Sequence, residues 1–216
     1  MKIRKIGWTS FTIEADNITI VTDPLVLKES GFNVPKTQAD VALFTDYKEE
    51  IDKTIIEDSG IDSKIVPNKR ETIFEIYTPG EYEIGGVMIR RNQTSNYYII
   101  DEGPYRVVYM GGIGKEIDVD SLKKLADVDV LILPVGEGEK FADYDTLEKI
   151  SSNLDPAIII PCAYSEDGGN ISNVKSKDDF LKHFGYTNVV EANYLAVTKK
   201  KVEEEQQSSV KIVVLK

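Results

Sequence analysis

The sequence predicts a mixed α/β (α+β) fold in which β-sheets are covered by helices. The first half of the chain is dominated by runs that alternate apolar and polar residues between glycine, proline and asparagine turns, as in a strand meander. The second half alternates fully apolar strands with amphipathic helical segments, a pattern typical of strands packed beneath helices. With 41% hydrophobic and 29% charged residues, the composition is that of an ordinary globular protein.

The strand-rich half divides at clear turn signals. Residues 2–24 alternate twice around Ala15-Asp16-Asn17, which predicts a hairpin. Residues 39–46 contain an apolar Val-Ala-Leu-Phe run and predict a buried strand, and residues 51–60 predict a short helix that ends at Gly60. Further strands, joined by tight turns at 79–80, 85–86 and 103–104, are expected within residues 64–68, 71–92 and 95–112.

The second half contains three expected helices and three expected strands. Residues 118–127 predict a helix capped by Asp118 or Asp120, and residues 176–185 predict a helix that ends at Gly185. The helix expected at 143–154 carries Leu147, Ile150 and Leu154 on one face. Apolar runs predict buried strands within 127–136 and 156–164, and a closing strand within 208–216.

Composition and charge narrow the class of protein. No linker-like stretch interrupts the 216 residues, so we expect one domain spanning residues 1–216. The net charge of −11 disfavours nucleic acid and anionic membranes as partners. No apolar run approaches the roughly 18 residues of a membrane-spanning helix, and the first residues lack the apolar core of a signal peptide. The single cysteine, Cys162, fits a reducing compartment, and we expect a cytoplasmic protein.

The order of these segments resembles the metallo-β-lactamase superfamily, in particular its small members similar to L-ascorbate-6-phosphate lactonase. The most specific carriers are Pro-Gly-Glu-Tyr-Glu-Ile-Gly-Gly at 79–86 and Asp-Val-Asp-Val-Leu-Ile-Leu-Pro-Val-Gly at 127–136. The resemblance covers nearly the whole chain. It implies a four-layer αββα sandwich with a metal site along one edge, on loops at strand ends.

The resemblance also implies where metal ligands would lie, and the expected histidines are missing there. In active members the strand matching residues 41–44 is followed by His-x-His-x-Asp-His, and imidazole nitrogens suit zinc. The chain has other residues at those positions, at the aspartate of the family's Gly-Asp motif, and at the family histidines in the first strand and after the strand within 156–161. We call this set of positions the vestigial cleft. With the supporting aspartate, it comprises Trp8, Asp23, Asp46, Lys48, Glu50, Ile51, Gly112 and Ala163. The loop after the strand that ends near Arg91 also lacks the family histidine, and the only histidine of the chain is His183.

Two interpretations of the remaining carboxylates stay open. Asp23, Asp46 and Glu50 are candidate ligands for Mg²⁺ or Mn²⁺, since hard cations accept oxygen ligands. In the alternative, Asp23 caps a turn before Pro24, and Asp46 and Glu50 are solvated loop charges. Cys162 and His183 are expected to be a buried hydrophobe and a residue near a helix C-terminus, respectively.

These observations predict a pseudoenzyme: a metallo-β-lactamase-fold protein with a degenerate metal site that acts as a binding or scaffold module. No catalytic residue and no cofactor is expected, zinc is disfavoured, and the partner is an unknown small molecule or protein, with a homo-oligomer as a further expectation. The alternative is a hydrolase of a small phosphorylated or lactone-like substrate that uses a carboxylate-bound Mg²⁺ or Mn²⁺. A third interpretation is a regulatory module that binds ligand at an open pocket rimmed by Arg90, Arg91 or Lys115.

Overall fold

Two large sheets form the centre of the protein in the computed structural model, which describes residues 1–46, 54–92, 96–111, 117–125, 127–168, 173–198 and 210–216. One sheet has six strands in the order β15-β1-β2-β3-β5-β7. Its strands are β1 (Lys2–Gly7), β2 (Ser10–Glu14), β3 (Thr19–Thr22), β5 (Val41–Leu43), β7 (Phe74–Ile76) and β15 (Leu195–Ala196). A separate parallel pair is formed by β4 (Thr37–Ala39) and β6 (Ile65–Pro67).

The second sheet has eight strands in the order β14-β16-β13-β12-β11-β10-β9-β8. An antiparallel meander from β8 to β11 continues into a parallel half from β11 to β14. The strands are β8 (Gly80–Ile84), β9 (Val87–Arg91), β10 (Tyr98–Glu102), β11 (Tyr105–Tyr109), β12 (Val130–Pro134), β13 (Ile158–Cys162), β14 (Val189–Ala192) and β16 (Lys211–Leu215).

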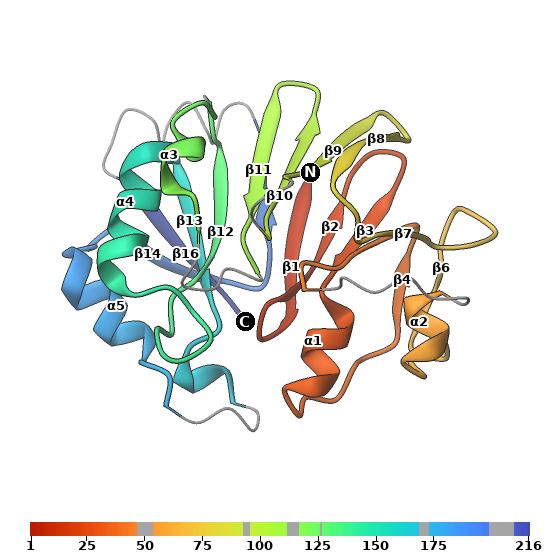
Figure 1. Cartoon of the computed structure of the whole chain (residues 1–216), viewed down its shortest axis with the longest axis horizontal. Coiled ribbons are helices and arrows are strands. Elements are labelled where there is room, and N and C mark those ends of the chain that lie inside the picture. The colour runs from red at the N-terminus through yellow and green to blue at the C-terminus, as the bar shows by residue number, and fades with distance from the viewer. Residues whose placement is uncertain (47–53, 93–95, 112–116, 126, 169–172, 199–209) are drawn as a thin grey trace.

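The two sheets pack face to face, and helices cover their outer faces (Figure 1). Helices α1 (Pro24–Glu29) and α2 (Ile55–Asp58) lie on the six-stranded sheet. Helices α3 (Val119–Leu122), α4 (Tyr144–Leu154) and α5 (Lys177–Phe184) lie on the parallel half of the eight-stranded sheet, and a short 3₁₀ turn spans Ser165–Asp167. The expected four-layer αββα sandwich is therefore confirmed.

Alternation along the strands builds three layers of apolar contact. In β12, Val130 and Ile132 join the core between the sheets, whereas Leu131 and Leu133 face the helices. On the other sheet, Val41 and Leu43 point inward. Because both faces of these strands are buried, the strands read as continuous apolar runs in the sequence.

Local capping begins helices α3, α4 and α5 where the sequence predicted them, although α3 ends at Leu122 and not near residue 127. The Asp143 side chain accepts from Thr146 N at the start of α4, and Asp118 accepts from Ser121 N at the start of α3. Ser176 forms a capping box with Asp179 at the start of α5, and Gly185 ends that helix in a left-handed conformation with φ 67°.

Several elements differ from the sequence prediction. Residues 2–22 form three strands and not one hairpin, because the chain turns at Trp8-Thr9 as well as between Ala15 and Ile18, and helix α1 begins at Pro24. Helix α1, β14 and β15 were not expected from local pattern. Within the described residues, no helix is long and apolar enough to cross a membrane.

Candidate functional site

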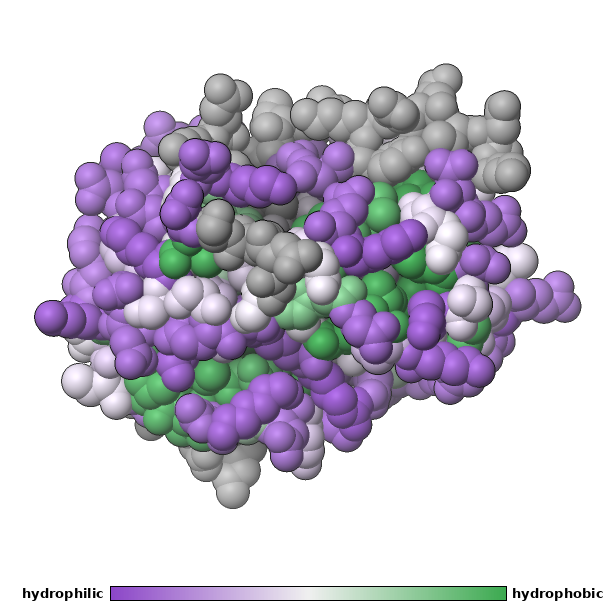
Figure 2. Space-filling model, turned by 90° about the horizontal axis from the view of Figure 1, so that it is seen from below, coloured by the Kyte–Doolittle hydropathy of each residue, from purple (hydrophilic) through white to green (hydrophobic). Residues whose placement is uncertain are grey.

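The vestigial cleft lies where the carboxyl ends of several strands meet at one edge of the sandwich. Asp23 follows β3, Asp46 follows β5 and Ala163 follows β13, while Trp8 forms the turn between β1 and β2. Viewed onto this edge in Figure 2, hydrophobic patches lie among hydrophilic side chains. Lys48, Glu50, Ile51 and Gly112, which complete the predicted cleft, fall outside the described residues.

A cavity of about 110 Å³ opens at this edge. The described residues that line it are Trp8, Val26, Glu29, Ser30, Asp46, Gly111, Lys140 and Phe141. The structure thus brings together Trp8 and Asp46 from the predicted cleft. It adds residues of α1 and of the loop before α4, which the sequence did not link to the site because only tertiary packing brings them there.

Asp23 is buried beneath the cavity, and three hydrogen bonds engage both of its carboxylate oxygens. Thr45 donates its backbone N–H to Oδ1 at 2.7 Å and its hydroxyl to Oδ2 at 2.7 Å. The Tyr109 hydroxyl also bonds to Oδ2, and it lies 2.8 Å from Thr9 O. Both oxygens of this carboxylate are therefore engaged in joining strand ends of the two sheets.

The environment of Asp23 changes its ionisation. Burial raises the pKa of this carboxyl from 3.8 to about 6, although the hydrogen bonds from Tyr109 and Thr45 oppose the rise. The neighbouring Asp46 charge raises it further. Burial and the Asp23 carboxylate together raise the pKa of Tyr109 well above its usual value, so Tyr109 is a neutral donor at physiological pH.

The proposed capping role of Asp23 is wrong in one respect. Asp23 does occupy the N-cap position before Pro24 in α1, with a left-handed φ of 42°, but its side chain makes no cap hydrogen bond. It points instead to Thr45 and Tyr109, because burial requires partners that a solvated cap would not need. Asp46 is exposed, as a solvated loop charge would be, and its carboxylate accepts from Asn96 Nδ2 at 3.4 Å.

Trp8 and Ala163, two members of the predicted vestigial cleft, are both buried. They belong to one apolar cluster with Phe141, whose ring centroid lies 5.8 Å from that of Trp8. Both backbones are left-handed, with φ 49° at Trp8 and 55° at Ala163, which is uncommon for residues other than glycine and asparagine. Positive φ at two residues with side chains costs free energy, which the surrounding packing has to offset.

Three long side chains of the eight-stranded sheet close the interior behind the cleft. The Tyr98 hydroxyl lies 2.9 Å from Phe44 O and 2.7 Å from Ile76 O, and Arg91 Nη2 donates to Thr45 O at 2.8 Å. With Tyr109, these residues tie one sheet to carbonyls at the strand ends of the other. We call Arg91, Tyr98 and Tyr109 the inter-sheet clamp. Sequence reasoning did not predict this unit, since its three residues lie on different strands and only the packing of the two sheets brings their partners within reach.

The rim predicted for a ligand-binding pocket is not formed by the arginines. Arg90 projects from the outer face of β9 and pairs with Asp101, and Arg91 is buried in the inter-sheet clamp. Neither residue lines the cavity, because alternation along β9 directs the two side chains to opposite faces of the sheet. Lys115 lies outside the described residues.

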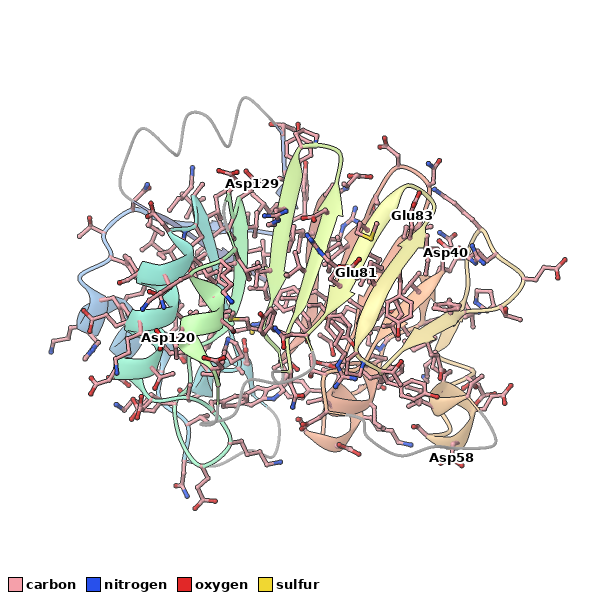
Figure 3. All side chains as sticks on the ribbon, turned by 45° about the horizontal axis from the view of Figure 1, so that its top comes forward. Asp40, Asp58, Glu81, Glu83, Asp120 and Asp129 are labelled. Atoms are coloured by element: carbon pink, nitrogen blue, oxygen red, sulfur yellow. The ribbon has the colours of Figure 1, made fainter. Side chains whose placement is uncertain are left out.

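A metal ion in the cleft would need a group of side chains that could hold it. Among the described residues, no three His, Cys, Asp or Glu side chains are grouped so as to hold one. His183 is exposed on α5, where it contacts Tyr144, and burial raises the pKa of the Cys162 thiol, which packs as a small hydrophobe. Of the carboxylates labelled in Figure 3, Asp58 lies on α2, Asp120 on α3, and Glu81 and Glu83 on the edge strand β8.

A buried ion pair lies next to the cleft. Lys5 of β1 pairs with Asp167, and their side chains are 5% and 7% exposed. The Lys5 ammonium also lies 4.4 Å from the centroid of the Tyr164 ring. Burial raises the pKa of the Asp167 carboxyl, and Lys5 opposes that rise. The pair links the first strand to the 3₁₀ turn at Ser165–Asp167, shortly after Ala163.

Comparisons with known proteins agree with this architecture. The chain is similar over its whole length to a candidate Zn-dependent hydrolase of the metallo-β-lactamase superfamily from Thermotoga maritima, with 25% identity, a TM-score of 0.74 and 98% of that chain covered. A candidate metal-dependent hydrolase from Parabacteroides distasonis shares 18% identity and a TM-score of 0.56, covering 99% of this chain and 93% of its own. Igni18, a metallo hydrolase from Ignicoccus hospitalis, shares 14% identity and a TM-score of 0.57, with 100% of this chain and 94% of that chain covered.

A search of curated proteins finds no match. The model of one family, described as the beta-lactamase superfamily domain, matches residues 2–163. That span includes both specific segments of the sequence and every strand end of the cleft. The chain therefore belongs to the metallo-β-lactamase superfamily.

Proposed function

We propose that this chain is a non-catalytic member of the superfamily, a pseudoenzyme that acts as a binding or scaffold module. The observation that carries the proposal is which side chains stand at the positions matched to the family's metal ligands, and how those side chains are buried and hydrogen-bonded. Trp8 and Ala163 are buried apolar side chains where histidines align, and the Asp23 carboxylate is occupied by Thr45 and Tyr109.

The chemistry of the superfamily explains why these changes matter. A zinc hydrolase activates water on a metal held by imidazole and carboxylate ligands, with one coordination position left open. Indole and methyl groups cannot replace imidazole nitrogens. A carboxylate that already accepts three hydrogen bonds in a buried site would lose them on turning toward a metal.

The cavity at the vestigial cleft supports a binding role. Its wall combines the aromatic residues Trp8 and Phe141 with charged residues at the surface, a mixture common in small-molecule sites. We propose a small molecule or a protein as the partner, in a cytoplasmic setting. A homo-oligomer, which light scattering of the purified protein tests, is a further part of the proposal.

The second candidate is a hydrolase that uses a carboxylate-bound Mg²⁺ or Mn²⁺. Two observations favour it: Glu29 and Asp46 line the same cavity, and the chain is similar to a candidate Zn-dependent hydrolase. Oxygen ligands at this rim suit hard cations better than zinc. Glu50 would have to contribute a further ligand.

Metal analysis distinguishes the two candidates. The protein is purified without added metal, then incubated with Zn²⁺, Mn²⁺ or Mg²⁺, desalted, and assayed for metal content and for phosphoesterase and lactonase activity. We expect substoichiometric metal and no turnover. One metal per chain that disappears in an Asp46→Ala, Glu50→Ala double variant, but persists in a Glu57→Ala, Asp58→Ala control on α2, would establish the hydrolase instead.

A further inference from the structure

The wall of the cleft cavity is aromatic where a metal would otherwise be held. Trp8 and Phe141 both line it, with ring centroids 5.8 Å apart and planes inclined by 52°. Phe32 packs against the other side of Trp8 at 6.0 Å. Aromatic rings that line a small cavity can attract a cation through their π-electrons.

The rim of the same cavity carries an excess of negative charge. Glu29 at the end of α1 and Asp46 after β5 line it, and Lys140 is the single cation among the described lining residues. The sum of these charges is −1, and the whole chain carries −11, so the local and overall potentials both favour a cationic ligand.

Ser30 supplies a polar group inside the cavity. The residue is 7% exposed and lines the cavity. A serine hydroxyl can donate one hydrogen bond and accept others, so it offers a polar partner to a ligand in the cavity. The aromatic wall, the acidic rim and the Ser30 hydroxyl are three separate features of one cavity.

We infer that this cavity binds a free small alkylammonium compound, with the cationic head against Trp8 and Phe141 and the charge balanced by Asp46 and Glu29. The inference rests on the proposed function, since it gives the binding module a ligand class. A cavity of about 150 Å³ accommodates benzene, so about 110 Å³ suits one compact head group.

The same features argue against an anion or a phosphorylated ligand. A phosphate attached near the ammonium group would lie at the rim beside Asp46 and Glu29, where like charges repel. We therefore assign the ligand as a free cation and not as the head group of a phospholipid.

The sequence provides a specific reporter for the test, because Trp8 is the only tryptophan of the chain. Choline and its neutral isostere 3,3-dimethylbutan-1-ol are titrated into the metal-free protein while Trp8 fluorescence is recorded, with calorimetry as a second measurement. Phosphocholine and phosphatidylcholine vesicles are tested alongside. We expect a saturable response to choline and a weaker response to each of the other three.

Charge variants sharpen the test. Asp46→Asn removes an exposed rim carboxylate and should weaken choline binding by about fivefold, whereas Lys140→Met should tighten it by about fivefold. Asp62→Asn, an exposed residue outside the cavity lining, is the matched control and should leave binding unchanged. Phe141→Leu should weaken binding of choline without changing the response to the neutral isostere.

Several outcomes would overturn the inference: no saturable response to choline, an equal response to the isostere, tighter binding of phosphocholine or vesicles, or weaker binding in Lys140→Met. These failures are distinct from failure of the proposed function. Stoichiometric metal with turnover would refute the pseudoenzyme, whereas a metal-free, inactive protein that ignores choline would refute the ligand assignment alone.

Discussion

The Asp23→Asn variant tests whether the buried carboxylate is the structural element described above. The amide keeps the shape of the carboxylate, and its oxygen can still accept from Thr45 N. Its nitrogen can donate to the Tyr109 hydroxyl, which then donates to Thr9 O. The variant therefore keeps most of the hydrogen bonds and removes the ionisation.

The expected effect follows from the raised pKa. A folded-state pKa of about 6 against 3.8 in the unfolded chain corresponds to about 3 kcal/mol. Because the pKa is raised, this stability is fully present below pH 3.8 and is lost as the pH rises through 6. Between pH 5 and pH 7.5 the wild type should lose about 1.4 kcal/mol from this group alone.

Urea unfolding at pH 5 and pH 7.5 measures this contribution for the wild type and the variant. Asp23→Asn should be less sensitive to pH than the wild type by about 1.4 kcal/mol, whatever constant offset the substitution introduces. Asp62→Asn, an exposed substitution of the same type, should follow the wild type at both pH values. Equal pH dependence in Asp23→Asn and the wild type would refute the assignment of a raised pKa to the buried Asp23.

Substitutions elsewhere around the site should also lower the stability of the folded protein. Lys5→Met leaves Asp167 buried without its cation and should lower the free energy of unfolding by about 3–5 kcal/mol. A Lys5→Met, Asp167→Leu double variant should recover stability, and a double variant as unstable as the single variant would contradict this account. Tyr98→Phe leaves the carbonyls of Phe44 and Ile76 without the bridging hydroxyl and should lower the free energy of unfolding by about 1–3 kcal/mol. Urea unfolding measures this change, and an unchanged midpoint would exclude a clamping role for Tyr98. Gly111→Ala places a Cβ 1.9 Å from the Tyr109 hydroxyl, which must then leave Asp23, and calorimetry should show a lower melting temperature; wild-type stability would show that the ring can move freely.

Much of the fold was predictable because its determinants are close together in the sequence. The cap residues Asp143 and Ser176 lie three residues from the N–H groups they satisfy, and Gly185 ends its helix through its own backbone conformation. The buried strands at 130–134 and 158–162 are apolar on both faces, so they read directly as strands. The presence of a single histidine also needs no structure to count, and it already weighed against a zinc site.

The chemical state of the cleft was decided only by tertiary packing. Asp23 and Tyr109 are 86 positions apart, and Lys5 and Asp167 are 162 apart, so no local pattern reveals that they meet. Helix α1 was missed because the prediction treated Asp23-Pro24 as a turn, whereas packing of Leu27 against the six-stranded sheet stabilises a helix there. The sequence by itself determined that the chain has a single histidine. The burial and hydrogen bonding of the cleft side chains arise where two sheets meet, because partners across that interface are chosen by three-dimensional proximity and not by spacing along the chain.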